Sequence, residues 1–125
     1  MAKARILVAD DEPDVVRALT LRLKAAGYEV VTANDGLEAT RVAVQELPDL
    51  ILLDIGMPCG DGHTVARRLR EKPKTADIPV IFVTARVSSE DLQDATEEGA
   101  AGYLLKPFQS DELLELVEQA LAAKA

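Results

Sequence analysis

Five short apolar runs, separated by longer segments with helical spacing, constrain the fold of this 125-residue chain more than any other feature. The runs comprise residues 6–9, 28–33, 50–53, 80–83 and 103–105. They are apolar nearly throughout instead of alternating with polar residues, which is typical of a parallel sheet covered on both faces. Strands that alternate with helices along the chain therefore predict an α/β doubly wound fold with one domain over residues 1–125.

The segments between the runs carry helix start and stop signals. Pro13 suits the first turn of a helix that ends before Gly27, and the pairs Asp35–Gly36 and Asp61–Gly62 precede two more helices. A fourth segment, residues 88–99, contains five acidic residues and little apolar surface, so we expect its helix to be held weakly by the sheet. The residues predicted to face inward in the first three helices are Val15, Leu19, Leu23, Ala26, Leu37, Val42, Ala43, Leu47, Val65 and Leu69.

Charge and composition exclude several classes of function. The 14 basic and 22 acidic residues give a formal net charge of -8, which argues against nucleic acid or an anionic membrane as the direct partner. One cysteine and one histidine, His63, argue against a disulfide framework, a cysteine-rich zinc site and a Ser-His-Asp triad. No apolar run reaches the length of a signal-peptide core or a membrane span. We expect a cytoplasmic domain, either standing alone or excised from a longer protein.

Acidic, hydroxyl and basic residues directly follow the first, third, fourth and fifth apolar runs. Asp10 and Asp11 follow the first run, Asp54 the third, Thr84 the fourth and Lys106 the fifth. In doubly wound sheets, ligands bind at the carboxyl ends of the strands. If the strand order is 2-1-3-4-5, as in the flavodoxin-like three-layer sandwich, the short side chains come from neighbouring strands about 4.8 Å apart, and the long lysine side chain reaches across from the edge. Each residue alone also fits an ordinary helix cap or a solvated side chain.

These residue types together suit phosphoryl chemistry. Clustered carboxylates are oxygen ligands of the kind that Mg²⁺ prefers, and a divalent ion would relieve the repulsion between Asp10 and Asp11. A carboxylate beside that ion can attack phosphorus to form an aspartyl phosphate. A lysine ammonium and a threonine hydroxyl can stabilise the phosphoryl oxygens, and the unobstructed backbone carbonyl of Gly56 can serve as a further metal ligand.

The motifs DDE at 10–12, ILLDIGMP at 51–58, FVTA at 82–85 and LLKPF at 104–108 together resemble the receiver domain of two-component response regulators, of the single-domain, chemotaxis-regulator-like kind. The resemblance covers essentially the whole chain in order. It implies that Asp54 accepts a phosphoryl group from a phosphohistidine, and that Lys106 and Thr84 bind its oxygens. It also implies that Asp10, Asp11, Asp54 and the Gly56 carbonyl hold Mg²⁺ or Mn²⁺, that Tyr103 is an aromatic switch and that Lys106–Pro107 is a cis peptide.

The resemblance further implies partners. The phosphodonor is expected to be a sensor histidine kinase or a histidine-containing phosphotransfer protein in a phosphorelay. The receiver would act on an effector protein or output domain, as a monomer or a weak dimer on the face formed by the fourth helix, fifth strand and fifth helix. It would catalyse its own phosphorylation and dephosphorylation without being a metabolic enzyme. Gly56 and Arg86 differ from the commonest residues at their positions, and these positions influence the lifetime of the phosphate in the family.

Two competing functions are weaker. A phosphohydrolase with an aspartyl-phosphate intermediate usually needs a second acid two residues after the nucleophile, where this chain has Gly56. A phosphate-independent interaction domain would be expected if the acids were missing, and they are present.

His63 is predicted to be solvated near the start of the third helix.

Overall fold

The computed structural model describes residues 3–59, 61–85 and 100–124. The strands in these residues are β1 (Arg5–Ala9), β2 (Glu29–Ala33), β3 (Leu50–Asp54), β4 (Val80–Thr84) and β5 (Gly102–Leu105). The helices are α1 (Pro13–Ala25), α2 (Gly36–Glu46), α3 (Gly62–Arg70) and α5 (Ser110–Lys124). The predicted acidic fourth helix, together with Gly60 and Arg86, lies outside the described residues. None of the described helices is both long and apolar enough to cross a membrane.

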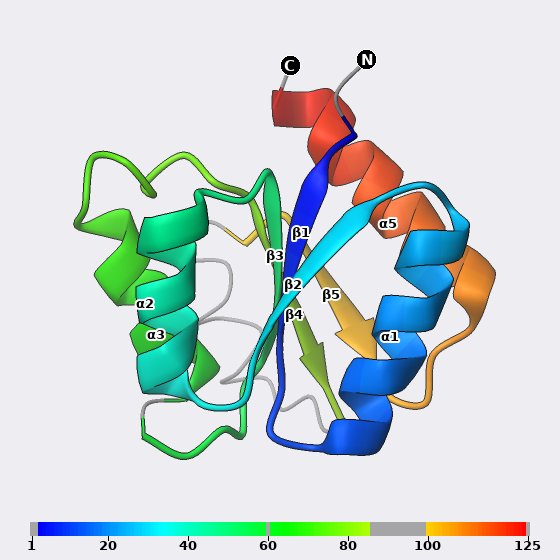
Figure 1. The fold of residues 1–125 in the computed structure, drawn as a ribbon, viewed down its shortest axis with the longest axis horizontal. Helices are drawn as coiled ribbons and strands as arrows, with labels where there is room; N and C mark the ends of the chain where they lie inside the picture. The colour runs from blue at the N-terminus through cyan, green and yellow to red at the C-terminus, as the bar shows by residue number, and fades with distance from the viewer. Residues whose placement is uncertain (1–2, 60, 86–99, 125) are drawn as a thin grey trace.

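All five strands are parallel and form one sheet in the order β2-β1-β3-β4-β5. Helices α2 and α3 cover one face of the sheet, and α1 and α5 cover the other (Figure 1). The predicted doubly wound α/β architecture and strand order are therefore confirmed. Because β3 pairs with both β1 and β4, its carboxyl end lies in the middle of the edge where the site was predicted.

The core explains why the strands are apolar nearly throughout. Successive side chains of a strand point to opposite faces of the sheet, and here both faces are covered. Leu7, Leu53 and Phe82 belong to the buried cluster on the α2 and α3 face. Leu52 and Val83 belong to the cluster under α1 and α5. All five residues of β3 and of β4 are buried. The polar residues that end these strands, Asp54 and Thr84, therefore lie at the boundary of the core.

The helix ends follow the predicted signals. Pro13 is the first residue of α1, and Gly27 follows that helix with a positive φ of 98°, which favours glycine. Asp35 caps α2 by accepting a hydrogen bond from the Glu38 backbone N–H at 2.8 Å. Asp61 caps α3 in the same way through the Thr64 N–H at 2.9 Å. These caps satisfy donors that a helix cannot pair internally.

Part of the predicted inward face is wrong. In α2, Leu37 is 66% exposed and Leu47 is 46% exposed, whereas Ala39, Val42 and Ala43 are buried. Leu37 lies about 200° around the helix from Ala39, so the two side chains cannot both face the sheet. Ala26 is also exposed, because α1 has already ended at that residue.

The close packing of α3 on β3 leads to a prediction about Gly62. A Cβ at this residue would lie 2.6 Å from the Asp54 carbonyl oxygen and 2.9 Å from the Ile55 Cα. Gly62→Ala is therefore expected to lower the free energy of unfolding by about 1–3 kcal/mol, measured by urea denaturation. The control is Gly56→Ala, whose added Cβ meets nothing within 4 Å, so its change should stay within about 0.5 kcal/mol. Equal losses for the two variants would contradict the packing argument.

Candidate functional site

Four carboxylates meet at the carboxyl edge of the sheet. Asp10 follows β1 and Asp54 ends β3, and these strands pair so that Ala9 lies opposite Leu53. One carboxylate oxygen from each of Asp10, Asp11, Glu12 and Asp54 lies within 4.8 Å of the others. Asp10 and Asp54 are buried, whereas Asp11 and Glu12 are exposed. The strand order thus brings together acids that are more than forty residues apart in sequence.

Lys106 supplies positive charge to this group. Its Nζ lies 2.8 Å from Asp10 Oδ2, 3.2 Å from Glu12 Oε1 and 3.7 Å from Asp54 Oδ1. The other oxygen of Asp10 accepts a hydrogen bond from the Glu12 backbone N–H at 2.9 Å. With a side chain only 12% exposed, the lysine lies among the carboxylates instead of extending into solvent. The predicted cis peptide between Lys106 and Pro107 is confirmed.

Most of the predicted site residues line one hollow. The hollow is bounded by Asp11, Glu12, Asp54, Ile55, Gly56, Thr84, Ala85 and Lys106. Asp10 lies beside it and is joined to it through Lys106. Thr84 is buried at the end of β4, and its carbonyl accepts a hydrogen bond from the Lys106 backbone N–H at 2.7 Å. The structure therefore gathers the predicted acids, hydroxyl and ammonium around one opening.

Tyr103 lies outside the hollow. It occupies the second position of β5, opposite Phe82 of β4, and the two ring centroids are 6.1 Å apart. The ring is half-buried and its hydroxyl oxygen is shielded from solvent. Tyr103 is therefore packed inward in this structure, on the α2 and α3 side of the sheet.

Burial and neighbouring charge change the acidity of two site residues. Burial raises the pKa of Asp54 above its ordinary value, and the Asp10 charge adds to this, although Lys106 and a hydrogen bond from the Gly56 backbone act in the opposite direction. For Lys106, burial alone would lower the pKa, but the hydrogen bond and charge of Asp10, with the charge of Asp54, outweigh it and raise the pKa. The ammonium is thus firmly protonated, whereas ionising Asp54 costs free energy.

The acidic group fits a divalent cation. Among residues 3–59, 61–85 and 100–124, four carboxylates face one ammonium at this site, so these residues place excess negative charge next to a buried strand end. Carboxylate oxygens of this kind are the ligands that Mg²⁺ and Mn²⁺ prefer. Asp11 and Asp54 line the hollow directly, whereas both oxygens of Asp10 already accept hydrogen bonds. The donor set and the excess charge are therefore compatible with a bound metal ion.

Two residues differ from the sequence analysis. Glu12 was quoted only as part of the DDE motif, yet it lines the hollow and contacts Lys106. Its place in an unbroken acidic run was the available signal. His63 was predicted to be solvated, which is wrong because it is only 7% exposed. It lies three residues before Ala66, on the buried side of α3, and this spacing could have indicated burial.

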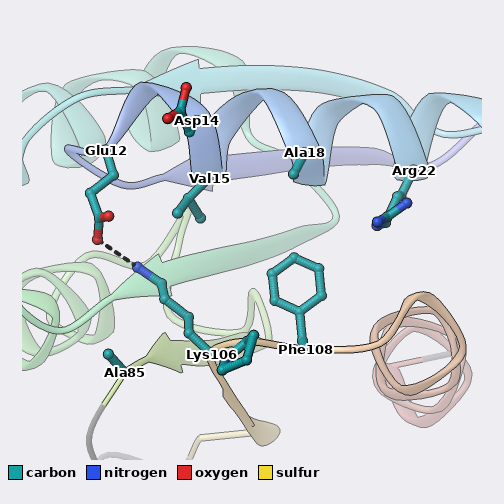
Figure 2. A pocket seen from close by; sticks show the side chains of 9 residues that line it. Glu12, Asp14, Val15, Ala18, Arg22, Ala85, Lys106 and Phe108 are labelled. Atoms are coloured by element: carbon teal, nitrogen blue, oxygen red, sulfur yellow. Dashed lines mark hydrogen bonds and ion pairs between the residues drawn. The ribbon is translucent and has the colours of Figure 1, made fainter.

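A second hollow adjoins the site between α1 and the segment that follows β5. Val15, Ala18 and Arg22 of α1 face Phe108 across it, and Glu12 and Lys106 lie at its end toward the site (Figure 2). Pro107 also lines this hollow. Its lining is mainly apolar, with charged side chains at both ends. It therefore resembles a docking surface more than a continuation of the acidic site.

Comparisons with known proteins agree with this geometry. The sequence matches the response regulator receiver domain family over residues 6–118. It is 44% identical over 117 residues to the DNA-binding dual master transcriptional regulator RpaA of Synechocystis sp., which covers 94% of this chain and 48% of that protein. The chemotaxis protein CheY4 of Vibrio cholerae has a TM-score of 0.90 at 33% identity, covering 95% of this chain and 99% of its own.

A third similar protein carries a metal. The receiver domain of the sensor histidine kinase PA1611 of Pseudomonas aeruginosa PAO1 has a magnesium ion coordinated in its active site cleft. Its TM-score is 0.89 at 30% identity, and 97% of this chain and 99% of that chain are covered.

A parallel doubly wound sheet with clustered acids and a lysine at its carboxyl edge defines the class of this domain. The chain belongs to the response regulator receiver domain family. It spans about half the length of RpaA and of several other curated relatives that it matches.

The raised pKa of Asp54 predicts a stabilising substitution. Asp54→Asn is expected to raise the free energy of unfolding at neutral pH by roughly 1 kcal/mol, because a neutral amide removes the cost of a buried charge beside Asp10. A carboxyl with a raised folded-state pKa contributes fully to stability below its ordinary value of 3.8, and this contribution is lost as pH rises through the folded-state pKa. The gain should therefore disappear in acid.

Chemical denaturation in a chelator, from acid to neutral pH, measures this difference. The control is Asp61→Asn, because Asp61 is an exposed cap outside the site and asparagine caps a helix equally well. A neutral-pH loss of stability in Asp54→Asn would contradict the prediction.

Proposed function

We propose that Asp54 accepts a phosphoryl group and that the domain is a phosphorylation-dependent signalling switch of a two-component or phosphorelay system. One observation carries this proposal: the Asp54 carboxylate faces an open hollow, 3.7 Å from the Lys106 ammonium and within 4.8 Å of three other acids. A carboxylate so held combines a nucleophile with the charges that phosphoryl transfer requires.

The proposed reaction forms one bond and breaks one. An oxygen of Asp54 attacks phosphorus, and the bond from phosphorus to the histidine nitrogen of the donor breaks, with that nitrogen keeping the electron pair. Lys106 and Thr84 bind the phosphoryl oxygens. Asp10, Asp11, Asp54 and the Gly56 carbonyl would hold Mg²⁺ or Mn²⁺, which supplies positive charge to the transferring group. Asp10 would act partly through water, as the family resemblance implies, and its two oxygens already accept hydrogen bonds from Lys106 and the Glu12 N–H.

The switch is proposed to begin at Thr84 and Tyr103. When the Thr84 hydroxyl moves toward a phosphate, it would leave space beside β5. The aromatic ring of Tyr103 would then occupy this space. Support comes from their positions: Thr84 lies opposite Leu105, two residues along β5 from Tyr103. A coupling of about 1–3 kcal/mol between the site and the partner surface is usual for such switches. The partner surface would be the face of the fourth helix, β5 and α5, where Leu105 is an exposed apolar residue.

The hollow of Figure 2 is proposed as the docking surface for the phosphodonor, a histidine kinase or a histidine-containing phosphotransfer protein. A protein donor must cover the opening above Asp54, and this hollow shares Glu12 and Lys106 with the site. Its apolar lining offers Val15 and Phe108 to a partner side chain, and Arg22 offers a charge. Direct binding of nucleic acid is not part of the proposal, given the net charge of -8.

The catalytic role proposed here is limited to the domain itself. Asp54 would be the nucleophile and would then carry the phosphoryl group. Each molecule would therefore catalyse its own phosphorylation and dephosphorylation, with no separate metabolic substrate. Gly56 leaves space next to the acceptor, since a Cβ there would meet no atom of the described residues within 4 Å. Water can therefore approach the phosphate from this side.

Phosphoryl labelling tests the acceptor. Incubation with acetyl phosphate and Mg²⁺ should add one phosphoryl group to Asp54, detected by intact mass and peptide mapping, and a chelator should prevent it. Asp54→Asn should abolish labelling, and Lys106→Ala should slow it by about tenfold or more, because removing a stabilising charge costs at least that factor. Asp61→Asn is the matched control and should be labelled normally. Label on another residue, or labelling that ignores Mg²⁺, would refute the proposal.

Charge reversal tests the docking surface. Arg22→Glu should slow transfer from a phosphorylated histidine protein that labels the wild type by about tenfold, which corresponds to roughly 1.4 kcal/mol. Labelling by acetyl phosphate should not change, because Arg22 lies away from Asp54. The control is Arg17→Glu, an exposed arginine of α1 that does not line the hollow. If the two variants slow protein-dependent transfer equally, the surface is not the docking site.

A further inference from the structure

The buried histidine is a group that the proposed function does not use. His63 is the second residue of α3 and is only 7% exposed. Its ring centroid lies 5.0 Å from that of Phe82, with the rings inclined by 44°. This spacing is within the 4.5–7 Å range of interacting aromatic pairs. His63 therefore contributes a ring to the core on the α2 and α3 side of the sheet.

Phe82 joins this histidine to the residue proposed as the switch. Its ring is fully buried and lies 6.1 Å from that of Tyr103, again in a tilted arrangement of 48°. Phe82 and Tyr103 are also paired in register across β4 and β5. The three rings thus form a continuous series from α3 through β4 to β5.

The same series runs beside the proposed phosphate site. Phe82 and Thr84 are two residues apart in β4, so their side chains lie on the same face of the sheet. At its other end, α3 is attached to the end of β3: the Gly62 N–H donates to the Ile55 carbonyl at 3.0 Å, and Gly62 packs against the Asp54 carbonyl. The backbone next to His63 is therefore held against the strand that carries the acceptor.

We propose that His63 is a positioning residue for the switch: its ring holds the Phe82 ring in the orientation against which Tyr103 packs when it points inward. The inference depends on the proposed function, because that function assigns Tyr103 its role. A ring at residue 63 favours the inward Tyr103, whereas an aliphatic side chain of similar size fills the core but lacks the aromatic contact. The ordinary alternative is that His63 only adds buried surface to the core.

The composition of the chain allows a direct measurement. The protein has two tyrosines and no tryptophan, so in a Tyr28→Phe background the intrinsic fluorescence reports Tyr103. Acrylamide quenching then measures how exposed Tyr103 is, with and without acetyl phosphate and Mg²⁺. His63→Leu should lower the ratio of buried to exposed Tyr103 by a factor of about two to twelve, the range expected for loss of one aromatic contact. His63→Phe should restore the quenching of the parent protein.

A control at another buried residue of α3 separates positioning from general loosening. Val65 belongs to the same core cluster, so Val65→Ala should lower the midpoint of urea denaturation while leaving Tyr103 quenching unchanged. The inference fails if His63→Leu matches the parent in quenching, or if Val65→Ala raises quenching as much as His63→Leu does.

Phosphorylation of Asp54 is measured by intact mass in the samples used for quenching. This measurement tests the proposed phosphoryl acceptor separately from the proposed role of His63. His63→Leu should still be labelled, because residue 63 lies outside the hollow. If acetyl phosphate does not label Asp54 even in the parent, the proposed function fails, whereas the quenching comparison without phosphodonor still decides the role of His63.

Discussion

The attraction between one ammonium and a group of carboxylates organises the functional edge of this domain. Lys106 reaches Asp10, Glu12 and Asp54, and its bond to Asp10 joins residues 96 positions apart in the chain. The contact can form only if β1, β3, β4 and β5 end at the same edge in that order. The sheet topology and the electrostatics of the site are therefore one constraint, because a different strand order would leave the buried Asp10 without its cation.

The same cluster of acids that makes Asp54 suited to react with phosphorus also lowers the stability of the folded domain. Two of the four acids are buried, and burial together with mutual repulsion makes the ionised Asp54 costly. A domain can tolerate this cost when the rest of the structure is well packed. Here β3 and β4 are buried along their whole length, and two apolar clusters cover both faces of the sheet. The stability of this buried core thus offsets the cost of holding repelling charges at one edge of the sheet.

The start of α3 connects the site with the rest of the molecule. Gly62 packs on the Asp54 carbonyl, and the next residue contacts Phe82, the neighbour of Tyr103. Any movement of Thr84 or Tyr103 therefore takes place next to α3, and α3 is held against β3, the strand that carries Asp54. Such contiguous packing is a physical route for coupling between a site and a distant surface, provided that the elements have two arrangements.

The sequence by itself determined the strands, the fold class and the edge at which the polar residues gather. Apolar runs define where each strand ends, and in a parallel sheet all those ends share one edge. Asp10, Asp54, Thr84 and Lys106 could therefore be assigned to one site. Only the tertiary structure decided which side of each helix faces the core, since Leu37 is exposed and His63 is buried. It also decided that Glu12 contacts Lys106 and that the pKa of Asp54 is raised. Periodicity describes a helix relative to its own axis, whereas burial and electrostatics depend on the elements packed around it.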